Sequence, residues 1–226
     1  MNPHDIFELV FDRFAQRYGP QHWWPADTPF EVMIGAILTQ AASWINVEMA
    51  ISNLKNSSVL TPVAIREIGE QELTQLIYPS GYYNQKARKL KALAKYIGDR
   101  FQDNLESMKR EDPGLLKEEL LGIYGIGEET ADAILLYAVD VPVFVVDNYT
   151  RRIFERLGVI AKGAKYVEIS SLFAANLASS RNIFGEYHAL IVRHGKDTCS
   201  KVPECDQCCL LDICAYGLQR SPTDSR

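Results

Sequence analysis

The chain is organised around a stretch that reads Leu121-Gly-Ile-Tyr-Gly-Ile-Gly-Glu-Glu-Thr-Ala131 and resumes, after an apolar run, as Val143-Phe-Val-Val-Asp-Asn-Tyr-Thr-Arg-Arg152. Gly125 and Gly127 lie between two segments of helical pattern. A tight turn needs residues without Cβ, which reach positive φ and let a partner approach the backbone. The amides of residues 125–128 would then point outward at the start of the next helix, where anions such as phosphate bind.

Asp147 is the second feature of this stretch. It follows the apolar, β-branched residues 141–146 and precedes a helical pattern that runs to Leu157. Residues 141–146 resemble a strand, but the chain offers no partner strand, so we expect a buried extended connector. An Asp before a helix most often caps it.

The composition is that of an ordinary globular protein of 226 residues with a net charge of −5. This charge argues against a generic nucleic-acid binder, which usually has a basic excess. A local basic face could come from Lys86, Arg88, Lys89, Lys91, Arg151, Arg152 and Arg156. On charge alone, solvated helix faces are the better interpretation. The sequence has no apolar run of roughly 20 residues and no visible secretory signal, so we expect a cytoplasmic protein.

Apolar residues at helical spacing predict an all-α fold. The expected helices cover 4–18, 30–39, 44–54, a segment opened by Thr61-Pro62, 69–77, 86–101, 115–121, 130–137, a helix ending at 157, 166–179 and 184–195. We expect Asp27 or Thr28 to cap the second helix, Thr61 the fourth, and Asp147 or Asn148 the helix that ends at residue 157. Residues 221–226 are expected to be a short disordered tail.

Four cysteines near the end of the chain are spaced as Cys199-x5-Cys205-x2-Cys208-x5-Cys214, with Cys209 left over. In a cytoplasmic protein, clustered cysteines are more often metal ligands than disulfides. Four thiolates suit either a zinc ion or a [4Fe-4S] cluster.

The string Leu121-x3-Gly125-Ile-Gly127-x2-Thr130-Ala131 resembles the helix-hairpin-helix motif of the endonuclease III superfamily of DNA glycosylases. The resemblance implies that the hairpin, with Gly125, Gly127 and Thr130, holds a DNA phosphate without reading sequence. It also implies a catalytic Asp downstream, and Asp147 matches that position. The implied architecture is a six-helix barrel over 29–140 and a second helical domain of 1–28 with 141–226, with DNA crossing the groove between them.

Cleavage of an N-glycosidic bond builds positive charge on the sugar, which a carboxylate near C1′ stabilises while it orients or deprotonates a water. The base must first be flipped out of the duplex. Bifunctional members of the superfamily carry a Lys two residues after the second glycine, whose amine forms a Schiff base. Glu129 stands there in this chain, so we expect a monofunctional glycosylase. We expect Glu128 and Glu129 to face solvent.

Within the superfamily, the chain is most similar to the endonuclease III-like 3-methyladenine DNA glycosylases, in Trp23-Trp-Pro25, Pro79-Ser-Gly-Tyr-Tyr-Asn-Gln-Lys-Ala87 and Gly125-Ile-Gly-Glu-Glu-Thr-Ala-Asp-Ala-Ile134. The resemblance implies a base pocket lined by Trp23, Trp24, Pro25 and Trp44. Aromatic faces attract a cationic alkylated purine. The alternatives are a packing plug for the Trp-Trp-Pro loop and core packing for Trp44.

The resemblance also assigns two residues to the space that a flipped base leaves. They are Gln40, in the turn after the early buried helix, and Tyr82, in the Gly-x-Tyr-Asn loop, where an exposed ring could stack on a base. Without the resemblance, Tyr82 reads as an ordinary turn tyrosine.

The superfamily closes with a [4Fe-4S] cluster, which implies Cys199, Cys205, Cys208 and Cys214 as ligands, with zinc as the alternative. Three features depart from the pattern. The first gap has five residues where six are usual, Cys209 stands where proline is common, and the best-known alkyladenine members lack these cysteines.

The predicted function is base excision of an alkylated purine from double-stranded DNA by a monomer, in the cytoplasm and on the nucleoid if the source is bacterial. Two alternatives remain: a glycosylase for uracil, thymine or mispaired adenine, and a non-catalytic binder of DNA structure.

Overall fold

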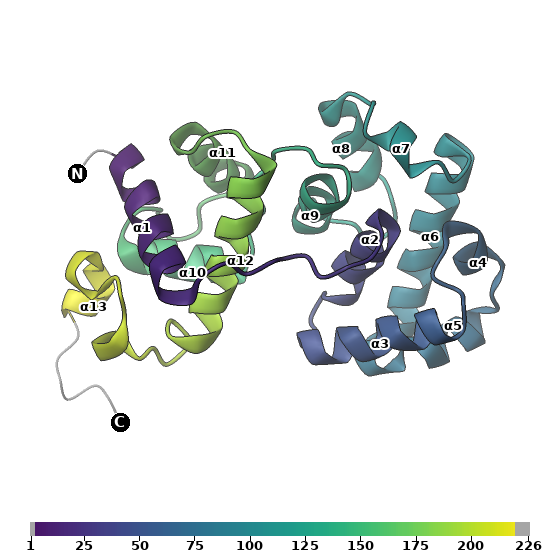
Figure 1. Ribbon diagram of the computed structural model, residues 1–226, viewed down its shortest axis with the longest axis horizontal. Coiled ribbons are helices and arrows are strands. Elements are labelled where there is room, and N and C mark those ends of the chain that lie inside the picture. The colour runs from purple at the N-terminus through teal and green to yellow at the C-terminus, as the bar shows by residue number, and fades with distance from the viewer. Residues whose placement is uncertain (1–2, 220–226) are drawn as a thin grey trace. The chain divides into compact units, whose positions relative to one another are not determined.

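The computed structural model describes residues 3–219, and over this range it contains helices and no strand (Figure 1). The helices are α1 (Pro3–Tyr18), α2 (Pro29–Leu38), α3 (Trp44–Asn56), α4 (Pro62–Glu67), α5 (Glu70–Leu76), η1 (Tyr78–Ser80), α6 (Tyr83–Phe101), α7 (Leu105–Met108), α8 (Pro113–Leu121), α9 (Glu128–Ala138), α10 (Asn148–Leu157), α11 (Tyr166–Asn176), α12 (Arg181–Asp197), η2 (Cys205–Gln207), η3 (Leu211–Ile213) and α13 (Ala215–Gln219). The all-α prediction is confirmed. The expected tail, 221–226, lies outside the described residues.

The chain forms two compact units. Unit 1 combines residues 1–23 with 142–226, and unit 2 is the continuous segment 24–141. Within the described range, none of the helices is long and apolar enough to cross a membrane.

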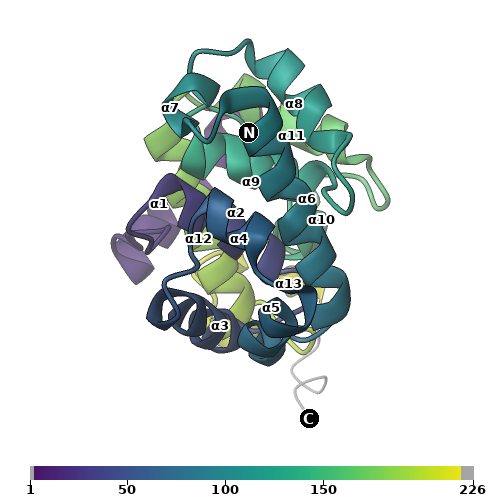
Figure 2. The ribbon, with the colours of Figure 1, turned by 90° about the vertical axis from the view of Figure 1, so that its right-hand side faces the viewer.

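Unit 2 is built around α2, which is buried along almost its whole length. This helix packs against α9, α6 and α3. Thr28 caps it, since its hydroxyl accepts the Glu31 N–H at 3.2 Å, while Asp27 pairs with Lys55. Of the two caps that the sequence allowed, the structure uses Thr28. The face of unit 2 formed by α3, α4, α5 and α6 is turned to the viewer in Figure 2.

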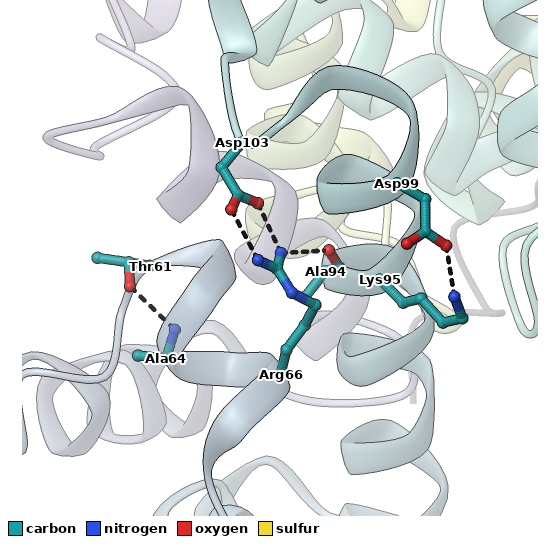
Figure 3. Close-up of polar contacts among 7 residues, drawn as sticks. All are labelled: Thr61, Ala64, Arg66, Ala94, Lys95, Asp99 and Asp103. Carbon is teal, nitrogen blue, oxygen red and sulfur yellow. Dashed lines mark hydrogen bonds and ion pairs between the residues drawn. The ribbon is translucent and has the colours of Figure 1, made fainter.

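The predicted cap of α4 is also confirmed, because Thr61 Oγ1 accepts the Ala64 N–H at 3.2 Å (Figure 3). Arg66, near the end of this helix, reaches α6 and makes a bidentate ion pair with Asp103 at 2.5 and 2.7 Å. It also donates to Ala94 O at 2.9 Å. A Cβ at Gly98 would lie 2.6 Å from the guanidinium, so the glycine permits this close contact between α4 and α6.

The core of unit 1 is aromatic. Rings from α1, the connector, α10, α11 and α12 contact one another, and they belong to Phe7, Phe144, Phe154, Phe173, Phe184 and Tyr187. The Phe144 and Phe173 rings stack with centroids 3.8 Å apart. Aromatic rings carry large apolar area and pack well edge to face, so a few of them suffice to join α1 to helices more than 140 residues later in the sequence.

Several element bounds differ from expectation. Helix α6 begins at Tyr83, three residues before the expected start, because Gly81 and Tyr82 turn the chain at φ +66° and +46°. Helix α8 begins at Pro113 because Asp112 caps it by accepting the Leu115 N–H. The helical segments α7, η1, η2, η3 and α13 were not predicted. Each has at most five residues, too few for a period of 3.6 to appear in the sequence.

Candidate active site, DNA-binding hairpin and cysteine loop

Asp147 occupies the N-cap of α10 at the end of the connector. Its Oδ1 accepts the backbone N–H of Thr150 at 2.7 Å and the Thr150 hydroxyl at 2.8 Å. Thr150 is fully buried and Asp147 is 8% exposed. Of the two caps that the sequence allowed, Asp147 and Asn148, the structure uses Asp147. One of its carboxylate oxygens is held by two hydrogen bonds.

The connector has the extended, strand-free conformation that the sequence predicted, and α11 satisfies its polar groups. Val146 N–H donates to the Tyr166 hydroxyl at 3.2 Å, and the Ser170 hydroxyl donates to Phe144 O at 2.8 Å. Side chains thus take the place of a partner strand. Since Phe144, Val145 and Val146 are buried, the backbone that presents Asp147 is held on both sides.

His188, on α12, faces the second oxygen of Asp147. Its Nε2 lies 3.7 Å from Asp147 Oδ2, and both side chains are 10% exposed. Burial lowers the pKa of His188 below its ordinary value, although the Asp147 charge acts in the opposite direction. The imidazole is therefore mainly neutral at pH 7. We did not expect this residue, because 40 residues separate the two side chains and no local pattern links them.

The hairpin lies between α8 and α9. Gly125 has φ +78°, whereas Gly127 is the extended N-cap of α9 at φ −102°, ψ −179°. Only Gly125 therefore requires the left-handed region. A Cβ on Gly127 would meet nothing within 4 Å, so this glycine leaves the hairpin backbone open at the start of α9. Lys117 on α8 pairs with the buried Asp132 on α9 at 2.7 Å and joins the two helices.

Glu128 and Glu129 are exposed in the first turn of α9, as expected. Thr130 is buried, and its hydroxyl oxygen accepts a hydrogen bond from Gln40 Nε2 at 2.9 Å. Gln40 Nε2 also donates to Gly125 O at 3.2 Å. The structure thus brings the turn after α2 to the hairpin.

The aromatic residues assigned to the base pocket are partly brought together. The Trp24 and Trp44 rings meet edge to face with centroids 5.7 Å apart. Trp24 also contacts Tyr137 at 5.5 Å, and a Cβ on Gly35 would lie 2.9 Å from the Trp24 ring. Pro25 is exposed, and Trp23 belongs to unit 1. Tyr137 was not predicted, because its position on α9 reads as core.

Tyr82 is 68% exposed and lies in the left-handed region at φ +46°, ψ +30°. Bulky residues rarely adopt this conformation, and it often marks a functional position. The backbone turn before α6 thus holds this ring in solvent.

The proposed basic face does not form as a set, since most of its members hold backbone carbonyls. Lys86 is 2% exposed and donates to Leu38 O at 2.8 Å and Ser80 O at 2.7 Å. Burial lowers the pKa of Lys86 to about 8. Lys91, Arg151, Arg152 and Arg156 also donate to carbonyls. Both interpretations of Lys86, a basic patch and a solvated helix face, are wrong, because this side chain is buried.

The four predicted ligand cysteines line one cavity in unit 1, together with Arg156 and Tyr216, and Cys209 is absent from its lining. Three N–H groups point at sulfur: Arg156 to Cys199 Sγ at 3.2 Å, Leu210 N to Cys208 Sγ at 3.4 Å, and Gly217 N to Cys214 Sγ at 3.4 Å. Burial raises the pKa of the Cys208 thiol to about 12. Among residues 3–219, no His, Cys, Asp or Glu side chains form a group of three or more around a single metal position.

Comparison with known proteins gives the family. Residues 34–178 match the family described as "HhH-GPD superfamily base excision DNA repair protein". The chain is 47% identical, over 94% of its length and 97% of the relative's, to a Methanocaldococcus jannaschii protein that carries the name of a DNA repair glycosylase. The chain belongs to the HhH-GPD superfamily.

Two solved structures are similar to this chain in fold. A Helicobacter pylori 3-methyladenine DNA glycosylase, bound to 1,N6-ethenoadenine, has 30% identity and a TM-score of 0.76, over 87% of this chain and 98% of that one. A trapped endonuclease III–DNA covalent intermediate has a TM-score of 0.83 at 23% identity, over 97% and 99% of the two chains. The protein is thus a base excision repair DNA glycosylase with the endonuclease III fold, and the predicted resemblance is confirmed.

Proposed function

We propose that this glycosylase is monofunctional and removes an alkylated purine, of the 3-methyladenine type, with Asp147 as its catalytic carboxylate. One observation carries the proposal: a carboxylate whose Oδ1 is held by Thr150 at the end of a backbone segment that cannot shift easily. Preorganised groups of this kind stabilise developing charge without reorganisation.

In the proposed mechanism, the two oxygens of Asp147 have separate tasks. Oδ1 stays bonded to the Thr150 N–H and hydroxyl. Oδ2 faces the deoxyribose as its C1′ becomes cationic, and it orients the water that attacks C1′. The glycosidic bond breaks with its electron pair leaving on the base, water supplies the new C1′ oxygen, and Asp147 accepts the water proton. A cationic alkylated base departs as a neutral molecule and needs no protonation.

The monofunctional assignment follows from Glu129. A carboxylate cannot form the imine that a lysine amine forms with the sugar aldehyde. Glu129 is exposed in the first turn of α9, which is the position that the resemblance gives to that lysine.

The substrate class is supported by the aromatic contacts of Trp24, Trp44 and Tyr137 and by the Helicobacter pylori relative, a 3-methyladenine DNA glycosylase solved with 1,N6-ethenoadenine. The family resemblance adds Trp23 and Pro25 to the proposed set of pocket residues. Aromatic faces hold a flat cation with about 1–2 kcal/mol of cation–π energy each when water is excluded. Neutral purines gain less from the same faces, so the pocket discriminates by charge.

We assign DNA binding to the hairpin, Tyr82 and Gln40. The amides at the start of α9, with Gly125, Gly127 and Thr130, would hold a phosphate of the duplex. Tyr82 would stack on a base beside the lesion, and Gln40 would contact the space that the flipped base leaves. A monomer presents all of these groups.

The cysteine cavity suits a [4Fe-4S] cluster in its donor set. Four sulfurs line it and N–H groups point at three of them, the hydrogen-bonding environment of cluster thiolates. Buried thiols with raised pKa values become thiolates only when a cation compensates their charge. A bound cluster would supply a cross-link between Cys199, Cys205, Cys208 and Cys214, and metal analysis separates it from zinc.

A lesion panel tests the function. Wild-type protein is incubated with duplexes that contain 3-methyladenine, ethenoadenine, uracil, a thymine mispair or an adenine mispair, and the released bases are quantified. We expect fastest release of 3-methyladenine, slower release of the neutral ethenoadenine, and no covalent adduct on borohydride reduction, with Glu129→Lys as the comparison variant. Faster release of a deaminated base would contradict the substrate class, and efficient trapping of wild type would contradict the monofunctional assignment.

A further inference from the structure

Gln40 in this protein is held at its carboxamide group by three hydrogen bonds. Its Nε2 donates to Gly125 O at 3.2 Å and to Thr130 Oγ1 at 2.9 Å, and its Oε1 accepts from Lys89 Nζ at 2.5 Å. Both N–H groups and the carbonyl oxygen are therefore engaged. The partners come from two segments far from Gln40 in sequence, the hairpin and α6.

Lys89 reaches this position because Gly125 has no side chain. A Cβ built on Gly125 would fall on the methylene stem of Lys89. The stem thus lies along the hairpin backbone and directs the ammonium at Gln40, in the manner of long basic side chains that bury their stems. Gly125 is required twice, for its positive φ and for this contact.

The neighbours of Lys89 on α6 behave differently. Arg88 is exposed and pairs with Glu70, and Lys95 is exposed and pairs with Asp99 on its own helix. Lys86 and Lys91 hold carbonyls within unit 2. Lys89 differs from these because it holds a side chain that the proposed function places on DNA.

We propose that Lys89 is a positioning residue that fixes the Gln40 carboxamide on the hairpin, so that Gln40 and the phosphate-binding amides meet the duplex as one preorganised surface. The inference rests on the proposed function for its DNA contact. A free glutamine has three rotatable bonds and loses their freedom when it binds. A glutamine already held by Lys89, Gly125 and Thr130 has lost that freedom before DNA arrives, which favours binding.

A double-mutant cycle tests the inference on DNA. Lys89→Met removes the ammonium and keeps the stem, Gln40→Ala removes its target, and Lys95→Met is the matched control on the same helix. Affinity is measured for a duplex that carries an uncleavable abasic-site analogue, at several salt concentrations. We expect each of the first two variants to weaken binding about 10-fold, the double variant to be no weaker than Gln40→Ala, and the control to match wild type.

Other results of this cycle would overturn the inference. The losses of binding free energy in the two single variants could add up in the double variant, and the slope of log affinity against log salt concentration could be smaller by about 1 in Lys89→Met. That result would mean that Lys89 binds a phosphate directly. Unchanged or stronger binding by Lys89→Met would mean that the contact does not prepare Gln40 for DNA. Lys89→Arg, which retains a cation and a donor, is expected to recover part of the affinity.

A measurement without DNA separates this inference from the proposed function. The side-chain NH₂ resonances of Gln40, assigned by their loss in Gln40→Ala, report the carboxamide environment in the free protein. We expect them to move and to exchange faster with water in Lys89→Met, while the remaining backbone resonances show an intact fold, and to stay in place in Lys95→Met. Unmoved resonances would overturn the positioning role even if base release is normal. Absence of base release with moved resonances would contradict only the proposed function.

Discussion

Asp147 and the hairpin surface are built in opposite ways. Asp147 is held by Thr150, three residues away in the same helix. The hairpin surface of unit 2 joins Gln40 to Thr130 over 90 positions and to Lys89 over 49. A carboxylate anchored within its own helical turn can lose its charge without loss of structure. In a surface assembled from distant segments, substitution of a residue that joins those segments is expected to lower stability together with the proposed DNA affinity. The two regions should therefore respond differently to substitution.

Asp147→Asn gives the largest expected effect. Asn caps a helix as well as Asp does, so α10 should persist while the charge is lost. We expect single-turnover release of an alkylated purine to fall by about 10³-fold, about 4 kcal/mol in activation free energy, with DNA affinity within about 2-fold of wild type.

Thr150→Val is the matched control for this cap, because it removes the hydroxyl donor and keeps the shape and the backbone N–H. Its loss of rate should be much smaller, about 10-fold, the size of one hydrogen bond to a charged group. If Asp147→Asn lost affinity in parallel with rate, the contrast between the two regions would fail.

The cysteine segment, residues 199–214, contacts the helix that Asp147 caps. Arg156, near the end of α10, binds Cys199 Sγ and Ser200 O. On the proposed [4Fe-4S] assignment, we expect Cys208→Ser to bind no iron and to have a free energy of unfolding lower by about 3 kcal/mol, since a cross-link of the fold is lost. Iron and sulfide analysis with thermal unfolding measures both.

Cys209→Ser is the control, because Cys209 does not line the cavity, and it should retain its metal. Loss of metal from both variants, or from neither, would contradict the assigned ligand set. Zinc in place of iron, at full activity, would replace the cluster with its alternative.

Substitutions of the two hairpin glycines are expected to have different effects on stability and on DNA binding. Gly125→Ala forces a side chain to φ +78° and against Lys89, which should cost about 2 kcal/mol of unfolding free energy. Gly127→Ala should leave stability within about 0.5 kcal/mol, because its backbone is extended and the space around it is open.

The DNA affinity of Gly127→Ala is the second quantity to compare. The new methyl of Gly127→Ala would stand at the proposed phosphate contact, so we expect weaker DNA binding, measured by titration, at unchanged stability, measured by chemical denaturation. An equal loss of stability in both variants would show that the hairpin does not separate these properties.

The smallest expected effect is a pH dependence from His188. Burial lowers its pKa in the folded protein, so the unfolded chain binds the proton first as pH falls below about 6.5. Stability from this group is therefore present above about pH 6.5 and is lost on acidification, by no more than about 1.4 kcal/mol per pH unit. Thermal unfolding between pH 7.5 and 5 should show a flatter profile for His188→Gln. An identical profile would exclude His188 as the cause.

Local patterns were sufficient for the scaffold. Most helix ranges, the cap Thr61, the hairpin and the strand-free connector follow from spacing and from residues within a turn of one another. The sequence left Asp27 or Thr28, and Asp147 or Asn148, open as caps. The caps and the helical period depend on residues no more than about four positions apart, which are visible in the linear sequence. The family resemblance rests on the same short strings, and the comparisons confirm it.

Tertiary structure alone decided how distant side chains pair. It brought His188 to Asp147, Tyr137 to Trp24 and Lys89 to Gln40, and it buried Lys86, which the helical pattern had assigned to a basic surface. A linear pattern records which face of a helix is apolar, but not which neighbour that face meets. The partner is chosen when the helices pack, since packing selects among many side chains of equal local suitability.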